Sequence, residues 1–357
     1  MSSNSLGNVL TLTTFGESHG PAIGGILDGF PAGIALDISL VQRQLDRRKP
    51  GQSALSTARK ESDTVEVLSG MMDGKSTGAP IAFMLKNEDQ RSKDYSNLKD
   101  VYRPGHADYT YQAKYGIRDH RGGGRSSART TAAWVAGGSL AEQLLPEGVE
   151  IIAWVDRVGT LSLDANTKPK NRTEVDQSDI RCPEASTAAA MEALVKEVKA
   201  QGDSLGGTIR CIVRGVPAGW GEPQFNKLSA ALGHAMLSIN AVKGFEIGDG
   251  FAIAQKRGSE VQDLFEVEEG QVKTSANHSG GLQGGISNGA ELDFRVAFKP
   301  VSSIAIAQQT ITKELEKTEI KIEGRHDPLV LPRAVPIVES LTALVLANFY
   351  LLQKVHS

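Results

Sequence analysis

Several short segments of the chain alternate hydrophobic and polar residues, which is typical of half-buried β-strands. In the clearest of them, residues 292–298, the side chains of Leu292, Phe294, Val296 and Phe298 fall on one face. The other segments that predict strands are residues 9–14, 23–27, 65–68, 81–85, 151–158 and 208–216. Because consecutive strands come in hairpin-like pairs, we expect antiparallel sheets.

Longer segments with apolar residues three or four positions apart predict α-helices. In residues 39–48 the apolar face includes Leu40 and Leu45, and the dipeptide Pro50-Gly51 ends the helix. The other predicted helices are residues 132–145, 183–201, 225–239 and 337–352. The last is the most apolar segment of the chain, but polar residues such as Glu339 interrupt it and it is too short to cross a bilayer, so we expect a buried helix.

Long helices between paired strands favour an α+β layered fold over a doubly wound parallel sheet. The 357 residues are 40% hydrophobic and 23% charged, as in an ordinary globular protein. The net charge of -3 argues against a general nucleic-acid binder, because such domains usually carry a basic excess. Cys182 and Cys211 fit neither a disulfide framework nor a metal-binding knuckle, and residues 1–12 lack a signal-peptide pattern, so we expect a reducing compartment.

The most distinctive chemistry lies in residues 103–129, a basic, glycine-rich loop that leads into a predicted helix. Arg118, Arg121, Arg125 and Arg129 are close together in this stretch. Arginine binds carboxylate and phosphate groups bidentately, and the three glycines at 122–124 leave the backbone open to a ligand.

Other side chains of the same stretch fit an anion site. Ser126 and Ser127 stand where the helix is expected to begin, so we predict that they cap it and leave its first N–H groups directed at an anion. His106 and His120 add imidazoles that titrate near neutral pH. A solvated basic loop without a ligand is the alternative interpretation.

Four further loops combine glycine or proline with polar side chains. They are residues 16–21, which include Glu17, Ser18 and His19, and residues 277–285, 299–303 and 324–328. Each alone is equally consistent with an ordinary connection. Residues 70–76 imitate a phosphate-binding P-loop, but three rather than four residues separate their glycines, so we predict a hairpin turn there.

Three motifs resemble those of the chorismate synthase family. In chain order they read Gly-Glu-Ser-His-Gly at 16–20, Arg-Gly-Gly-Gly-Arg-Ser-Ser-Ala-Arg at 121–129 and Arg-His-Asp-Pro at 325–328. The resemblance covers nearly the whole chain, so it implies one domain over residues 1–357. It implies a sandwich of helices between antiparallel β-sheets, assembled as a homotetramer in the cytoplasm.

The resemblance also implies a phosphate lyase of the shikimate pathway, which leads to the aromatic amino acids. Such an enzyme converts 5-enolpyruvylshikimate 3-phosphate to chorismate and phosphate by a 1,4-elimination. It uses reduced FMN with no net redox change, and it needs no metal. A substrate with one phosphate and two carboxylates, beside an anionic flavin, matches the clustered arginines of this chain.

Individual roles follow from the same resemblance. His19 would donate a proton to the departing phosphate, and His106 would keep the reduced flavin suitably protonated. Asp327, with Ser127, would assist removal of the C6 proton through flavin N5. The implied substrate-binding residues are Arg48, Arg103, Arg129 and Ser18. The implied flavin-binding residues are Arg125, Ser126, Ser127, Asn240, Ala241, Gly284, Lys299, Pro300, Val301, Ser302, Ser303 and Arg325.

Three positions depart from the family pattern. Ala54 stands in place of a common arginine, Thr130 in place of a frequent Glu, and Leu329 in place of a small residue. None of them removes a proposed acid or base. At Ala54 one anion contact is either missing or replaced by Arg59 or Lys60.

Two other functions fit parts of the sequence. An RNA-binding protein could use the Arg/Gly-rich loop, although aromatic residues make up only 5% of the chain and no RNA-stacking motif accompanies the arginines. A nucleotide-dependent phosphotransferase would need the P-loop spacing that residues 70–76 lack.

The source of reduced flavin is a separate question. No Gly-x-Gly-x-x-Gly fingerprint follows a predicted strand, so we expect an external reductant to supply reduced FMN. The alternative is that NADPH uses the substrate pocket itself, with Arg48 holding its phosphate.

Overall fold

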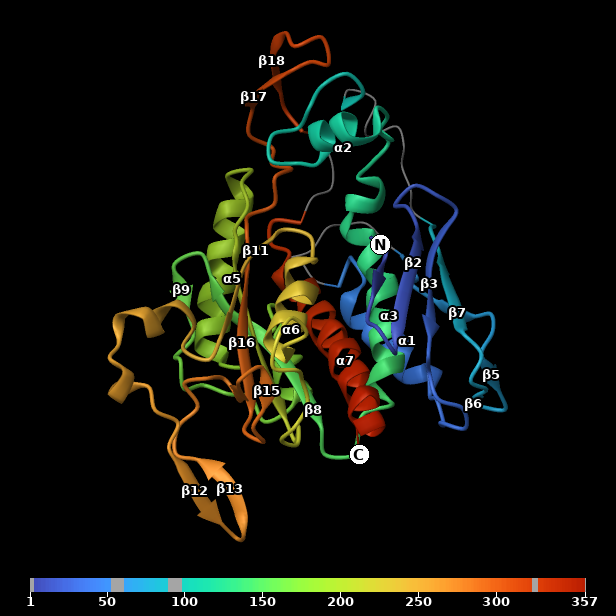
Figure 1. The fold of residues 1–357 in the computed structure, drawn as a ribbon. Helices are drawn as coiled ribbons and strands as arrows, with labels where there is room; N and C mark the ends of the chain where they lie inside the picture. Colours follow the sequence, from blue (N-terminus) through green and yellow to red (C-terminus); the bar gives the residue numbers. More distant parts are fainter. Residues whose placement is uncertain (1–2, 53–60, 89–97, 323–326, 357) are drawn as a thin grey trace.

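The structure is a computed structural model that describes residues 3–52, 61–88, 98–322 and 327–356. Two five-stranded antiparallel sheets flank a layer that contains α1, α3 and α7 (Figure 1). The first sheet has the order β1 (Ser5–Leu6), β2 (Thr11–Gly16), β3 (Ala22–Asp28), β7 (Ile81–Lys86), β4 (Val65–Val67). The second has the order β11 (Val242–Ile247), β16 (Leu292–Phe298), β10 (Gly207–Arg214), β8 (Glu150–Val158), β9 (Leu161–Ser162). This architecture confirms the predicted α+β layered fold with antiparallel sheets.

The helices and the smaller hairpins complete the chain. The helices are α1 (Ile38–Arg48), α2 (Asp108–Tyr115), α3 (Thr131–Glu142), α4 (Arg172–Val175), α5 (Ala185–Ala200), α6 (Leu228–Leu237) and α7 (Leu331–His356). The paired short strands are β5 (Met71–Met72) with β6 (Lys75–Ser76), β12 (Phe265–Glu268) with β13 (Gln271–Thr274), β14 (Leu282–Gln283) with β15 (Ile286–Ser287), and β17 (Gln308–Ile311) with β18 (Lys317–Ile320). The β5–β6 pair confirms the hairpin predicted at residues 70–76, and its turn residues Asp73 and Gly74 both have positive φ.

The middle layer joins the two sheets. Helix α3 packs on the first sheet and against α7, and α7 packs on β8 and β10 of the second sheet. At the α3–α7 crossing, a Cβ added to Gly138 would lie 2.3 Å from the backbone oxygen of Ser340, so glycine is what allows the two helices to approach this closely. The buried hydrophobic side chains of both sheets and of the helices between them form one continuous cluster.

Helix α7 begins at Leu331, earlier than the apolar pattern predicts, and it contains Pro336. Proline has no N–H to donate to the carbonyl four residues earlier, which belongs to Pro332. The guanidinium of Arg181 donates to that carbonyl instead, so the proline is accommodated. By length and composition α7 could span a bilayer, but 89% of its apolar window is buried inside the described fold, as in a core helix.

Several short elements were not predicted from the sequence: α2, α4, β1, β9, β11 and the strands of the hairpins β12–β13, β14–β15 and β17–β18. Strand β11 has an irregular register between Val242 and Gly244, and this breaks the alternation that would have revealed it. Helix α2 buries only Asp108 and has no apolar face, so its sequence lacks the hydrophobic periodicity that predicts a helix. The predicted helix at residues 225–239 begins later, at Leu228, since the side chain of Phe225 is 95% exposed.

Candidate active site

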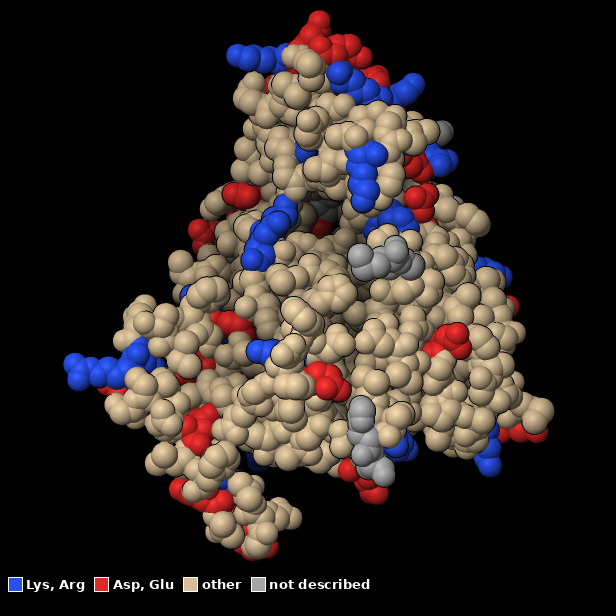
Figure 2. All heavy atoms as spheres, in the orientation of Figure 1, with Lys and Arg blue, Asp and Glu red and all other residues tan. Residues whose placement is uncertain are grey.

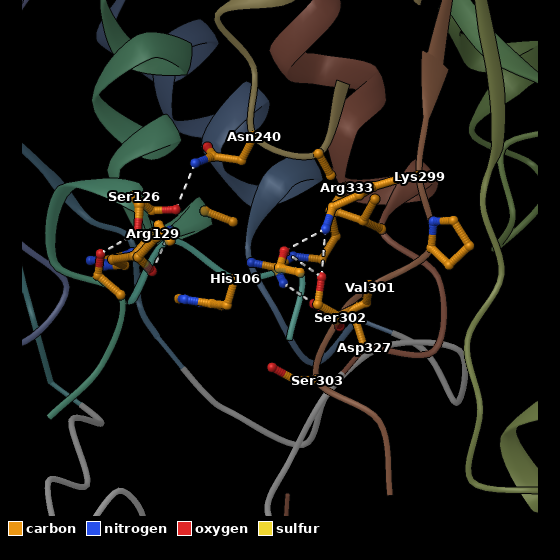
Figure 3. A pocket seen from close by; sticks show the side chains of 18 of the residues that line it. His106, Ser126, Arg129, Asn240, Lys299, Val301, Ser302, Ser303, Asp327 and Arg333 are labelled. Carbon is orange, nitrogen blue, oxygen red and sulfur yellow. Dashed lines mark hydrogen bonds and ion pairs between the residues drawn. The ribbon is translucent and has the colours of Figure 1, made fainter. Parts of the chain in front are cut away.

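A cavity of about 450 Å³ opens where segments from distant parts of the chain meet (Figure 3). They are the end of α1, the turn before α2, the glycine-rich loop before α3, the exit of α6, the loop after β16 and the start of α7. The charged residues that line it are Arg48, Glu61, Arg103, Arg129, Lys299, Asp327 and Arg333, with His106 beside them. On the face drawn in Figure 2 the surface is hollowed beneath the region of α2, and Lys and Arg side chains stand at the rim.

Two arginines on the cavity wall are held by one buried carboxylate. Arg48 Nη2 lies 2.6 Å from Asp63 Oδ2, and Arg129 Nη1 forms an ion pair with Asp63 Oδ1. Burial lowers the pKa of Arg48 to about 10. Burial alone would raise the pKa of Asp63, but Arg48 and Arg129 outweigh it and bring that pKa to about 2. The carboxylate is therefore charged at neutral pH and fixes both guanidinium groups.

Two further hydrogen bonds order the rest of the Arg129 side chain. Its Nε donates to Asn87 Oδ1 at 2.8 Å, and its Nη2 donates to the Lys86 carbonyl at 3.0 Å, both at the end of β7. Arg48 Nη1 donates to the Ala128 carbonyl at 3.3 Å, whereas the buried Arg48 Nε has no hydrogen-bond partner among the described residues. A donor of this kind on a cavity wall is a place for a ligand acceptor.

A third arginine, Arg103, is fixed by Asp108. Its Nε and Nη2 donate to the two carboxylate oxygens at 2.8 and 2.7 Å, which is a bidentate pair with both side chains buried. Burial would raise the pKa of Asp108, but the hydrogen bonds from Arg103 and the nearby imidazole of His106 hold it well below its usual range. His106 lines the cavity on the same turn.

The residues that resemble flavin contacts form another part of the wall. Asn240 Nδ2 donates to the Ser126 carbonyl at 2.7 Å, and its buried Oδ1 has no partner in the described part of the chain. Lys299 Nζ donates to the Gly105 carbonyl at 2.7 Å and contacts Ser302 Oγ at 2.5 Å. Burial, with a contribution from Lys243, lowers the pKa of Lys299. Ala241, Pro300, Val301 and Ser303 complete this side.

Asp327 lies on the cavity wall just before α7. It forms an ion pair with Arg333 Nη1, and Arg333 Nε donates to the Arg48 carbonyl at 3.2 Å. The start of α7 is thereby tied to the end of α1, and a carboxylate stands among the cations of the cavity (Figure 3).

The two serines of the glycine-rich loop behave differently from each other. Ser127 caps the short 3₁₀ turn Ala128–Thr130, because its side chain accepts from the Arg129 N–H at 3.2 Å. Ser126 instead donates its hydroxyl to the Gly123 carbonyl at 2.6 Å, and the N-cap residue of α3 is Thr130, so the prediction that the two serines cap that helix is wrong. Both residues line the cavity.

Of the four clustered arginines, Arg129 is the one that lines this cavity in the described part of the chain. Arg125 donates to the Gly16 carbonyl at 3.0 Å and to Thr14 Oγ1 at 2.9 Å, so it joins the loop to β2. Arg118 donates to three carbonyls between residues 98 and 101, and Arg121 pairs with Asp119 near the surface. Spacing alone could not distinguish Arg129 from these three arginines, which do not line the first cavity.

Ser18 and His19 do not line the cavity directly. Ser18 is 1% exposed, and its Oγ lies 3.1 Å from His19 Nδ1. The ring of His19 packs against Gly122, where an added Cβ would come within 2.3 Å of it. His19 therefore lies against the glycine-rich loop, and a side chain at position 122 would require the imidazole to move.

A second cavity of about 840 Å³ adjoins the first and has Arg125 and Glu17 on its wall. The two cavities share His106, Ala107, Gly123, Ser126 and Asn240. His120 lines neither of them.

Two implied flavin contacts are not on the wall of the first cavity. Gly284 lies in the turn between β14 and β15 with a φ of 62° and is not among the lining residues. Arg325 lies outside the described residues, as do Ala54, Arg59 and Lys60. Thr130 and Leu329, the other two departures, are both buried, at 2% and 1% exposure.

The sequence analysis missed Asp63, Asp108, Glu61 and Arg333. The sequence around Asp63 and Asp108 does not indicate a role in the site. Their role depends on the arginines that the fold places beside them. Arg333 falls inside the start of α7, which the apolar pattern placed later. Among the residues that the structure describes, no group of three or more His, Cys, Asp and Glu side chains could hold a metal ion.

Comparison with known proteins gives the family of this arrangement. The family model described as chorismate synthase matches residues 10–351. The chain belongs to the chorismate synthase family. A chorismate synthase of Parabacteroides distasonis is 56% identical over 98% of both chains, and one of Christiangramia forsetii is 55% identical over 99% of both. A crystal structure of chorismate synthase superposes with a TM-score of 0.77 at 29% identity, over 97% of this chain and 93% of that one.

The chain is thus an enzyme of the chorismate synthase family, a lyase of aromatic amino-acid biosynthesis. Two of the three motifs that suggested this family contribute to the cavity wall, through Ser127 and Arg129 of one and Asp327 of the other. Nothing in the comparisons supports the RNA-binding alternative.

Proposed function

We propose that this enzyme converts 5-enolpyruvylshikimate 3-phosphate to chorismate and phosphate by a 1,4-elimination, with reduced FMN as cofactor, in the cytoplasm. The observation that carries the proposal is the charge of the cavity. Arg48, Arg103, Arg129, Lys299 and Arg333 line it, against Glu61 and Asp327 as the carboxylates among the described lining residues. A substrate with a phosphate and two carboxylates needs such an excess of fixed cations.

The wall of the cavity also fits a flavin. Asn240 Oδ1 is a buried acceptor with no partner among the described residues, and the N–H groups of a flavin could donate to it. Ser126, Asn240, Ala241 and the segment from Lys299 to Ser303 would hold the cofactor. When bound, reduced FMN would supply electron density that supports phosphate loss and would accept the C6 hydrogen.

The arginines have a positioning role in this proposal. Asp63 fixes Arg48 and Arg129, and Asp108 fixes Arg103, before any ligand binds. The conformational entropy of these long side chains is therefore lost on folding and does not reduce the affinity for the substrate. A substrate held at its anionic groups would present its ring at the middle of the cavity.

Four side chains would take part in proton transfer. His19, which contacts Ser18 and packs against Gly122 on the wall of the second cavity, would protonate the departing phosphate. His106, on the wall shared by the two cavities, would keep the reduced flavin suitably protonated. Asp327 would assist removal of the C6 proton with Ser127, and its ion pair with Arg333 fixes the position of the carboxylate.

The working enzyme is, in this proposal, a homotetramer. The β12–β13 hairpin extends from the body of the molecule (Figure 1). Val267 pairs with Val272, and with Phe265 they form an apolar face whose residues are 78%, 65% and 68% exposed. An isolated two-stranded hairpin is marginal in water, so this face is suited to cover another copy of the chain.

Light scattering tests this assembly. Val267→Asp should lower the molar mass of the assembly, because a carboxylate would have to be buried at the contact. Glu266→Gln, on the opposite face of the same hairpin, is the matched control and should leave the mass unchanged. An unaltered mass in the Val267 variant would exclude this hairpin from the contact.

Genetic complementation tests the activity in a cell. The chain, expressed in a bacterium that lacks its own chorismate synthase, should restore growth without aromatic amino acids, and the His106→Ala variant should not. Failure of the unaltered, soluble chain to restore growth would contradict the proposal. A salt-dependent shift with RNA and no flavin binding would favour the RNA-binding alternative instead.

A further inference from the structure

Asp108 is a buried carboxylate at the start of α2, 4% exposed, and it does not line the first cavity. An acidic residue in the first turn of a helix is common, because it complements the helix dipole. That general preference does not account for the set of groups that surround this carboxylate.

Three cationic or titratable side chains converge on Asp108. Arg103 donates its backbone N–H and its Nε to Oδ2 at 3.0 and 2.8 Å, and its Nη2 to Oδ1 at 2.7 Å. Arg118 Nη1 lies 3.0 Å from Oδ1, and His106 Nδ1 lies 3.2 Å from the same oxygen. The carboxylate thus contacts an implied substrate arginine and an implied acid–base histidine together.

A tight turn makes this convergence possible. The His106 N–H donates to the Arg103 carbonyl at 3.2 Å, and Gly105 between them has a φ of 66°, where glycine is favoured. The turn folds Arg103 and His106 back over the first residue of α2. Both side chains then reach the cavity wall from the same support.

The contact with His106 specifies one ring nitrogen. Nδ1 is buried and has no well-aligned hydrogen bond among the described residues, so its short distance to Asp108 Oδ1 is the polar contact that a small ring rotation would align. When one imidazole nitrogen faces a carboxylate it carries the proton, and the other nitrogen is left to exchange protons.

We propose that Asp108 is a positioning residue: its carboxylate orients His106 through Nδ1, leaves Nε2 as the proton-exchanging atom, and fixes Arg103 for the substrate. This inference rests on the proposed function, since it assigns an atom to the role of His106. It predicts two separable effects on catalysis, one through the histidine and one through the arginine.

A double-mutant cycle separates them. Asp108→Asn keeps the size of the side chain but removes the charge, so kcat should fall at least tenfold and KM for the phosphorylated substrate should rise several-fold. In a His106→Ala background the same substitution should leave kcat almost unchanged, while the effect on KM persists, because the histidine through which Asp108 acts on kcat is gone.

A matched control is available elsewhere in the chain. Asp249 Oδ2 contacts His278 Nδ1 at 2.8 Å and Lys256 Nζ at 2.6 Å, which is a similar carboxylate between an imidazole and a cation, and neither Asp249 nor His278 lines the two cavities. Asp249→Asn should leave both kcat and KM unchanged. Each variant is compared with the unaltered chain by circular dichroism and thermal unfolding.

The outcomes are distinct. Losses of kcat that multiply in the double variant would show that Asp108 acts independently of His106 and would overturn the inference. If Asp108→Asn does not fold, Asp108→Glu replaces it, because it keeps the charge beside Arg103 and Arg118 but displaces the carboxylate; the same non-additivity is expected, and multiplied losses again overturn the inference. If the unaltered chain itself makes no chorismate, the proposed function has failed rather than the role of Asp108.

Discussion

The carboxylate of Asp63 accepts a 2.6 Å hydrogen bond from Arg48 in the interior of the protein, where both side chains are at most 1% exposed. The other carboxylate oxygen pairs with Arg129. Two arginines of the candidate site therefore depend on one acidic residue that does not line the cavity. Breaking a buried ion pair of this kind usually costs about 3–5 kcal/mol, because it leaves a charge without compensation.

We expect Asp63→Asn to lower the free energy of unfolding at pH 7 by about that amount. The pKa of Asp63 is about 2 in the folded state against 3.8 ordinarily, so the unfolded state binds more protons between these values. The contribution of Asp63 is complete above about pH 4 and is lost as the pH falls toward 2. The variant should therefore lose stability less steeply than the unaltered chain over this range.

Denaturant unfolding at pH 7, and thermal unfolding between pH 5 and pH 2, measure these differences. Asp46→Asn is the control. Asp46, on α1, forms a solvent-exposed ion pair with Lys49 at the end of that helix, and such pairs contribute less than about 1 kcal/mol. Equal unfolding free energies of the Asp63 variant and the unaltered chain would show that the buried pair does not support the fold.

Sequence reasoning was most successful where local pattern determines structure. The alternation in β16 and the apolar face of α1 were enough to predict those elements, and the motif residues Arg129, Ser127 and Asp327 do line one cavity. Arg125 has the same local context as Arg129 but is used to join the loop to β2.

Contacts between distant segments could not be predicted in this way. Asp63 matters because it meets Arg129, 66 positions later, and no feature of its own neighbourhood indicates that. In the same way Ser126 stands beside the cap residue, but its hydroxyl is closer to the Gly123 carbonyl, which only the folded loop reveals. Packing, rather than residue type, decides these roles.

Replacing either proposed proton-transfer histidine should slow turnover while ligands still bind. His106→Ala and His19→Ala should each lower kcat about a hundredfold or more, which is the usual contribution of a positioned acid or base. Their dissociation constants for FMN and substrate should change little, since arginines provide most of the anchoring. His234→Ala, on α6 away from the first cavity, is the control, and near-normal turnover in a His19 or His106 variant would refute its role.

FMN and substrate should bind cooperatively, because both would share the cations of one cavity. We expect FMN titrated by its fluorescence to bind more tightly when the phosphorylated substrate is present. Lys299→Ala should weaken FMN binding about tenfold, equivalent to about 1.4 kcal/mol, whereas Lys313→Ala, which removes a surface pair with Asp100, should not. Equal FMN affinities with and without substrate would contradict a shared cavity.

The enzyme should depend on reduced FMN from outside. The cations and glycines of the described cavity are already assigned to substrate and flavin, and the sequence has no dinucleotide fingerprint. An aerobic mixture of enzyme, NADPH, oxidised FMN and substrate, without added reductase or dithionite, should therefore form no chorismate. Sustained formation there would mean that NADPH enters the cavity and that this chain reduces its own flavin.

The most direct test of the account is an anaerobic reaction with chemically reduced FMN and 5-enolpyruvylshikimate 3-phosphate. Chorismate is followed by its absorbance, released phosphate is measured in the same samples, and flavin oxidation is monitored throughout. We predict one phosphate for each chorismate over many turnovers, with the flavin still reduced at the end and no product when FMN stays oxidised. Phosphate release without chorismate, or product formation that is independent of reduced flavin, would contradict the proposed reaction.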